Sequence, residues 1–199
     1  MAVSRFSQSS AQNAFQKFNN VWDGKSAVGS MDALATITTS AAASASVTFS
    51  SIPQTYSHLQ LRCQIMGTQT LGVYMQINGD TSTNYSYHWL WADGSATPSS
   101  NNSTNQTVCN LFGYTIGANT VAPATLIVDL LDYTDTNKYK TVRSLGGSDK
   151  NGTGEIMLMS SVWRKAGSGV TSDAITSLKI LTSGGNFAAN SVFSLYGTK

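Results

Sequence analysis

Apolar and polar residues alternate with a period of two along most of the chain after residue 32. The pattern is plainest in His58–Met66 and Gly72–Ile77, where nearly every second side chain is apolar. A half-buried strand has this period, because successive side chains point to opposite faces of a sheet. Further strand-like segments cover residues 33–39, 47–49, 85–91, 108–114, 124–132, 138–145, 155–164, 175–181 and 192–196. Roughly ten short strands separated by turns predict a β-sandwich or barrel.

Three segments within this region lead to more detailed predictions. Ala124–Leu131 is apolar on both faces, which is typical of a central strand that is covered on both sides. Asn78-Gly79 follows a predicted strand directly, and this dipeptide is the strongest short signal for a β-hairpin. Ser95–Gln106 consists mostly of Ser, Asn and Thr, and we expect it to form a long surface loop.

The first 31 residues differ from the rest of the chain. Residues 9–22 have helical spacing, which places Phe15, Phe18 and Trp22 on one face of a short helix. A helix of this length needs tertiary contacts for its stability. We therefore predict an N-terminal arm and linker at residues 1–31, whose three aromatic residues contact either its own domain or a neighbouring subunit. Residues 32–199 should form one antiparallel, jelly-roll-like β-sandwich, so the fold class is all-β with one short helix in the arm.

Composition limits the classes of function that remain. Charged residues make up 11% of the 199 residues, less than half of the usual share, and the net charge is only +2. Nucleic-acid binding requires a basic surface, which this composition does not provide. No apolar stretch approaches the length of a membrane-spanning helix, and residues 1–10 lack the apolar core of a secretory signal. We therefore expect neither nucleic acid nor membrane as a partner.

Candidate catalytic residues are few and have simpler explanations. Asp80 and Asp93 form the best pair of loop carboxylates, and glycoside hydrolysis needs such a pair. Each of them, however, lies beside a glycine in a predicted turn, where Asp is favoured for its backbone hydrogen bonds. No Gly-x-Ser-x-Gly elbow or phosphate-binding loop is present. The sequence predicts a protein that is not an enzyme and has no catalytic residues.

The chain offers two histidines and two cysteines as potential metal ligands. His58, His88, Cys63 and Cys109 show none of the paired spacings that zinc sites use. Both cysteines lie in predicted strands of a domain large enough to fold without a disulfide, so we expect buried free thiols. We predict no metal site and no cofactor.

One predicted strand concentrates aromatic residues on a single face. Period two places Tyr85, Tyr87, Trp89 and Trp91 on one side of this strand. The face could belong to the hydrophobic core, because large aromatic residues dominate cores. It could also form an inter-subunit contact, where Tyr and Trp are enriched. As a third alternative, its flat rings could form a platform for a carbohydrate.

Several motifs occur in an order that resembles a known type of protein. Residues 51–62 read S-I-P-Q-T-Y-S-H-L-Q-L-R, and they are followed by N-G-D at 78–80 and N-Y-S-Y-H at 84–88. The chain ends with S-V-F-S-L-Y-G at 191–197. This series resembles small virion structural proteins of tailed bacteriophages, of the type found in phages of cyanobacteria and marine bacteria. The resemblance covers roughly the whole predicted β region.

The resemblance implies a non-enzymatic structural protein of the virion, assembled in the host cytoplasm. Its first implication is a capsid decoration (cement) protein, a homotrimer that binds and stabilises the shell through the major capsid protein or other virion proteins. The alternative is a tail fibre or adhesin component that binds a host surface glycan. The resemblance brings no catalytic residues with it.

Overall fold

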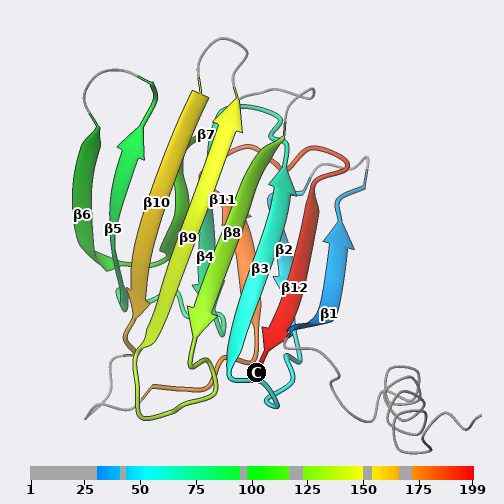
Figure 1. Cartoon of the computed structure of the whole chain (residues 1–199), viewed down its shortest axis with the longest axis vertical. Helices are drawn as coiled ribbons and strands as arrows, with labels where there is room; N and C mark the ends of the chain where they lie inside the picture. Colours follow the sequence, from blue (N-terminus) through cyan, green and yellow to red (C-terminus); the bar gives the residue numbers. More distant parts are fainter. Residues whose placement is uncertain (1–30, 41–43, 95–97, 117–122, 150–153, 166–171) are drawn as a thin grey trace, which may run out of the picture.

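The chain forms two antiparallel β-sheets that pack face to face. The computed structural model describes residues 31–40, 44–94, 98–116, 123–149, 154–165 and 172–199, and within them it contains strands and no helix. The larger sheet has eight strands in the order β1-β12-β3-β8-β9-β10-β5-β6, and the smaller has four in the order β2-β11-β4-β7. In Figure 1 the larger sheet lies in front and the smaller sheet behind it.

The larger sheet consists of β1 (Met31–Thr38), β3 (His58–Ile65), β5 (Tyr85–Ala92), β6 (Ser99–Gln106), β8 (Ala124–Leu131), β9 (Lys140–Asp149), β10 (Gly154–Trp163) and β12 (Val192–Thr198). The smaller sheet consists of β2 (Ser46–Phe49), β4 (Leu71–Ile77), β7 (Cys109–Ile116) and β11 (Leu178–Thr182). The prediction of an all-β fold with two antiparallel sheets is therefore confirmed. The jelly-roll-like connectivity stays a prediction, and the predicted helix with Phe15, Phe18 and Trp22 lies outside the described residues.

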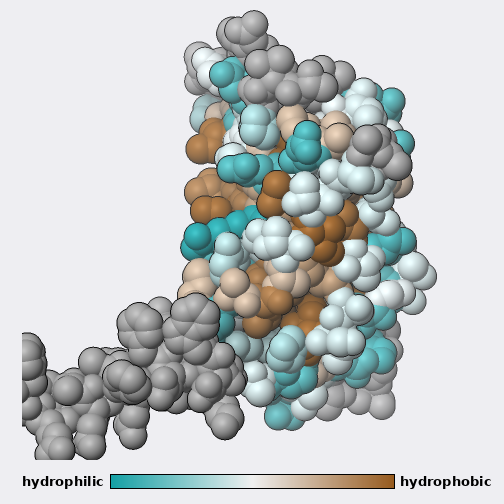
Figure 2. Space-filling model, turned by 90° about the vertical axis from the view of Figure 1, so that its right-hand side faces the viewer, coloured by the Kyte–Doolittle hydropathy of each residue, from teal (hydrophilic) through white to brown (hydrophobic). Residues whose placement is uncertain are grey.

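The hydrophobic core fills the space between the sheets. Each sheet contributes every second side chain of its strands, as the period of two requires. The large sheet supplies Leu61 and Val128 and the small sheet supplies Met75 and Phe112, all fully buried. Figure 2 looks at one open edge of the sandwich, where brown hydrophobic side chains run between the two layers.

Both cysteines belong to this core, as predicted. Cys63 in β3 and Cys109 in β7 are buried and are not joined by a disulfide. Burial raises the pKa of both thiols well above its ordinary value, because the thiolate would be poorly solvated. They act as small hydrophobic side chains.

The Asn78-Gly79 turn forms, but it does not close a hairpin. Asn78 and Gly79 both have positive φ, and Asp80 N donates to Ile77 O at 2.9 Å. Strand β4 before the turn belongs to the small sheet, whereas β5 after it belongs to the large sheet. The predicted hairpin is therefore wrong. Tertiary pairing decided the outcome, since β4 pairs with β11 and β7 while β5 pairs with β10 and β6.

The loop predicted for Ser95–Gln106 is also wrong over most of its length. Residues 99–106 form β6, which pairs with β5 at the edge of the large sheet. The register shifts between Tyr85 and Tyr87, and Asn105 on the opposing strand has a positive φ of 56°. Ser and Asn have low strand propensity, but pairing with β5 supplies backbone hydrogen bonds regardless of side chain. A polar edge strand also discourages further strand addition.

Strand β8 was predicted to be covered on both faces, and it is covered on one. It lies in the middle of the large sheet between β3 and β9. Leu126, Val128 and Leu130 face the core and are buried, but Ile127 on the other face is 46% exposed. The outer face of this strand, which carries Thr125 and Asp129 as well as Ile127 and Leu131, is therefore open to solvent.

Candidate functional site

The two sheets differ in width, and this difference creates a recess at one side of the sandwich. The small sheet ends at β7, which packs against β9 and β10 of the large sheet. Strands β5 and β6 continue the large sheet beyond β10. Their inner faces therefore have only partial cover, even though β5 carries the aromatic side chains of a core strand.

The aromatic side chains of β5 lie partly in the core and partly in the recess. Tyr85, at the start of β5, is fully buried; its hydroxyl donates to Asp80 O at 3.0 Å and accepts from Ile77 N at 3.1 Å. Burial raises the pKa of this phenol, so the hydroxyl stays protonated and acts as a donor. Tyr87, Trp89 and Trp91 are only partly buried. The core interpretation thus holds fully for Tyr85 and in part for the other three.

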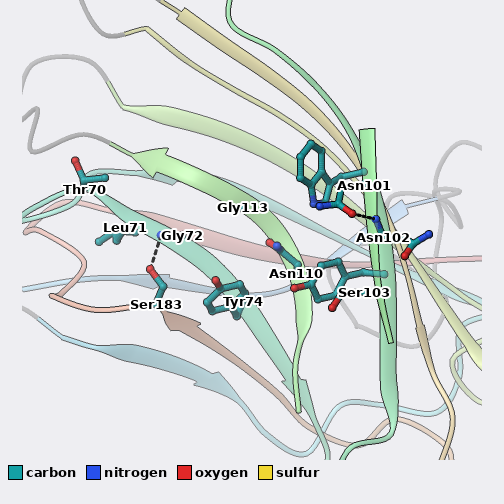
Figure 3. Close-up of a pocket in the computed structure, with 12 residues that line it drawn as sticks. Thr70, Leu71, Gly72, Tyr74, Asn101, Asn102, Ser103, Asn110, Gly113 and Ser183 are labelled. Carbon is teal, nitrogen blue, oxygen red and sulfur yellow. Dashed lines mark hydrogen bonds between the residues drawn. The ribbon is translucent and has the colours of Figure 1, made fainter. Parts of the chain in front are cut away.

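Tyr87 and Trp89 line a pocket of about 430 Å³ at this recess, which we call the inter-sheet pocket. One wall comes from β5 and β6, where Asn101 pairs with Trp89 and Ser103 with Tyr87. The opposite wall comes from β4 and the residue before it, from β7, and from the residue that follows β11. It contains Thr70, Leu71, Gly72, Tyr74, Asn110, Gly113 and Ser183. Figure 3 shows the two walls facing each other across the pocket.

The polar groups of the inter-sheet pocket are amides and hydroxyls. Ser183 Oγ accepts from Gly72 N at 2.7 Å, and Asn101 Oδ1 accepts from Asn102 N at 2.8 Å, so both side chains are held in place. Asn110 is 5% exposed, and its Oδ1 atom has no hydrogen-bond partner among the described residues. A buried acceptor without a partner is uncommon in folded proteins and calls for an explanation.

The wall contributed by Asn110 and Tyr74 was not predicted from the sequence. Asn110 stands between Cys109 and Leu111 in a strand that is otherwise largely apolar, and this isolated polar residue was a usable signal. Which aromatic residues it would face depends on the pairing of β7 with β4, and no local pattern encodes that pairing.

A second feature lies on the outer face of the large sheet. Leu90 of β5 pairs with Leu158 of β10, Leu158 with Leu145 of β9, and Leu145 with Ile127 of β8. These four side chains form a row across four adjacent strands, and Ile156 adds to it on the next row; we call the five residues the aliphatic row. They are between 46% and 57% exposed. In Figure 2 brown side chains project from the left flank, which is the front face of Figure 1.

Asp80, one member of the best carboxylate pair of the sequence, is held in its turn by side-chain and backbone donors. Asp80 accepts hydrogen bonds from Trp163 Nε1 at 2.7 Å, Asn84 Nδ2 at 2.8 Å and Ser82 N at 2.9 Å. Partial burial opposes ionisation, but these donors outweigh it together and lower the pKa of Asp80. A carboxylate stabilised in this way is a poor proton donor near neutral pH. Asp80 fastens the β4–β5 connection to β10.

The four potential metal ligands lie apart. Cys63 and Cys109 are buried in different sheets, His88 is exposed on the outer face of β5, and His58 Nδ1 accepts from Asp132 N at 3.0 Å. Within the described ranges no group of three or more His, Cys, Asp or Glu side chains is placed to hold a metal ion. No helix among these residues is long and apolar enough to cross a membrane.

Comparison with known proteins does not place the chain in a family. No protein family, no curated protein and no solved structure matches it.

Proposed function

We propose that this protein is a non-enzymatic structural component of a tailed-bacteriophage virion, a capsid decoration protein that binds the shell and stabilises it. The proposal combines the order of sequence motifs with one structural observation, the aliphatic row. The resemblance further implies a homotrimer and assembly in the host cytoplasm. The attachment surface is the outer face of the large sheet.

The aliphatic row carries the proposal because soluble monomers rarely expose such a continuous apolar surface. Five large aliphatic side chains gather in the centre of the sheet, and polar side chains such as Arg62 and His88 surround them. A contiguous apolar patch with a polar rim marks a protein–protein contact. Ile127 extends this patch onto β8, whose outer face also carries Thr125 and Asp129. The cover of the aliphatic row then comes from another protein.

We assign the major capsid protein as the occupant of this face. The row also flanks a groove of about 170 Å³ that is lined almost entirely by apolar side chains, among them Leu90, Leu145, Ile156 and Leu158. No charged residue is among the described residues that line the groove, so an apolar segment fits it better than a charged surface. A second copy of this chain is the competing occupant, and the experiment below separates the two.

The test is to locate the protein on the virion of the phage that encodes it. Lys199 is exposed and follows the last strand, so a gold-binding tag at the C-terminus should not disturb the fold. Negative-stain imaging should show a regular lattice of label over the head. Label confined to the tail would refute the decoration role.

Variants then test the attachment surface. Leu145→Ser with Leu158→Ser should lower the amount of protein bound to undecorated shells by about tenfold or more, since both are central contacts. Tyr139→Ser is the matched control, because Tyr139 is 40% exposed but lies outside the aliphatic row. If the double variant loses self-association and keeps shell binding, the row joins copies of this chain instead.

The inter-sheet pocket favours a second candidate function, a tail fibre or adhesin component that binds a host surface glycan. The supporting observation is the combination of Tyr87, Trp89 and neighbouring amides in one concave site. The imaging experiment distinguishes this candidate from the first, since it predicts label on the tail.

A further inference from the structure

We infer that the inter-sheet pocket binds a neutral saccharide. This inference goes beyond attachment to the particle and holds whether the protein sits on the head or on the tail. It rests on three properties of the pocket: partly uncovered aromatic rings, a buried acceptor without a partner among the described residues, and the absence of charged side chains from the described lining.

The aromatic rings provide the apolar part of the site. Tyr87 and Trp89 project from the inner face of β5, which β7 covers only in part. Packing within the sandwich therefore leaves ring surface exposed inside a recess. The apolar C–H faces of a sugar ring can cover such surface while its hydroxyls remain at the edge, where polar groups can reach them.

The amide of Asn110 provides the second property. Asn110 lines the pocket, and its Oδ1 atom is buried and accepts no hydrogen bond from the described residues. In the view of Figure 3, Asn110 lies between Tyr74 of β4 and Ser103 of β6. A buried acceptor left unpaired destabilises the folded chain. A sugar hydroxyl is a donor of the right kind to satisfy it, and the cost is then recovered on binding.

The uncharged lining of the pocket favours an uncharged ligand. The twelve lining residues include no Asp, Glu, Lys, Arg or His. A phosphate, a sulfate or an acidic sugar would find no cation there, and its charge would lose hydration without compensation. The volume of about 430 Å³ lies within the range of small-ligand sites. A neutral mono- or disaccharide therefore fits the site best.

Titration of the full chain with defined sugars tests the inference. The panel consists of glucose, galactose, mannose, N-acetylglucosamine, maltose, lactose and cellobiose, with glucuronic acid and N-acetylneuraminic acid as anionic counterparts. Two-dimensional NMR of the indole N–H groups reports on Trp89 directly. At least one neutral sugar should shift the Trp89 signal with saturation by roughly 10 mM, as a millimolar site requires, and the acidic sugars should not.

Two variants connect the binding to the pocket. Trp89→Ala should weaken binding by about tenfold. Asn110→Leu should weaken it by a similar factor while the melting temperature stays equal or rises, because a buried acceptor without a partner is replaced by an apolar group of similar shape. A merely structural Asn110 would instead lower the melting temperature and leave sugar binding intact.

Two further variants serve as controls for sugar binding in the inter-sheet pocket. His88→Ala alters the same strand on its opposite, exposed face and should bind like the wild type. Asn101→Trp fills the pocket mouth from an exposed position that folding tolerates, so it should abolish binding even if Trp89→Ala fails to fold. Absence of any shift across the panel, tighter binding of the acidic sugars, or undiminished binding by Asn101→Trp would each overturn the inference.

Discussion

The contact between the two sheets can be tested at Gly146. This residue lies on the inner face of β9, where the ring of Phe112 from β7 packs directly on its backbone. A methyl group added at Gly146 would lie 2.7 Å from Phe112 Cδ2, 3.1 Å from Phe112 Cε2 and 3.2 Å from Leu126 Cγ. A contact of 2.7 Å is shorter than packed Cβ atoms make, so Gly146→Ala must force the two sheets or the Phe112 ring to move.

The expected loss follows from two opposing effects. Overpacking a core costs about 1–3 kcal/mol of the free energy of unfolding. Replacing Gly by Ala also reduces the entropy of the unfolded chain, which returns about 0.4–1 kcal/mol. The net destabilisation of Gly146→Ala should be about 1–2 kcal/mol. For a domain of this size, that corresponds to a melting temperature about 2–8 °C below the wild type.

Urea denaturation followed by circular dichroism measures this loss, and two further variants make the test specific. Gly147→Ala is the matched control: its methyl would lie on the other face, 3.3 Å from Glu155 O, and stability should change by about 0.5 kcal/mol or less. Phe112→Leu removes the ring atoms that clash. The double variant Gly146→Ala with Phe112→Leu should have a free energy of unfolding about 1 kcal/mol higher than the sum of the two single effects predicts. A Gly146→Ala protein as stable as the wild type would refute the packing of Phe112 on β9.

Three further predictions concern buried polar groups and thiols. Asp80→Asn should be less stable than the wild type at pH 7. Because the folded-state pKa of Asp80 is lowered, the difference should persist above about pH 4 and disappear as the pH falls through that lowered value, as urea midpoints across this range will show. Lys140 is fully buried, and its ammonium donates to Asp135 O and Lys138 O. Lys140→Met should lower the free energy of unfolding by about 1–3 kcal/mol in urea denaturation, because two carbonyl groups lose their donor. An unchanged urea midpoint would contradict this role of Lys140. Cys63 and Cys109 should resist a thiol reagent such as dithionitrobenzoate in the native protein and react in denaturant, and rapid native labelling would refute their burial.

Local sequence patterns were sufficient to locate nearly all of the strands. Alternation with period two reports directly on which face of a strand meets the core, and it placed β3 and β4 within about one residue of their observed ends. The Asn78-Gly79 turn was also predictable, because Asn followed by Gly tolerates positive φ at two successive residues. The burial of Cys63 and Cys109 followed from their positions in such strands.

The partners of each strand could not be read from the chain. Strands β4 and β5 flank a hairpin-type turn but belong to different sheets, since β-sheet pairing joins segments that are distant in sequence. Strand β6 was missed for the same reason: its Ser and Asn residues carry no strand signal, and only the free edge of β5 holds them extended.

For the candidate sites as well, the sequence determined some features and the tertiary structure determined the others. The sequence by itself determined that Tyr85, Tyr87, Trp89 and Trp91 share one face. Tertiary structure decided that a narrower second sheet ends at β7, which buries Tyr85 and leaves Tyr87 and Trp89 lining a pocket opposite Asn110. It also decided that β5, β8, β9 and β10 align their outer aliphatic residues in one row. The physical reason is that side-chain direction is a local property of the backbone, whereas cover and register depend on which distant strand packs alongside.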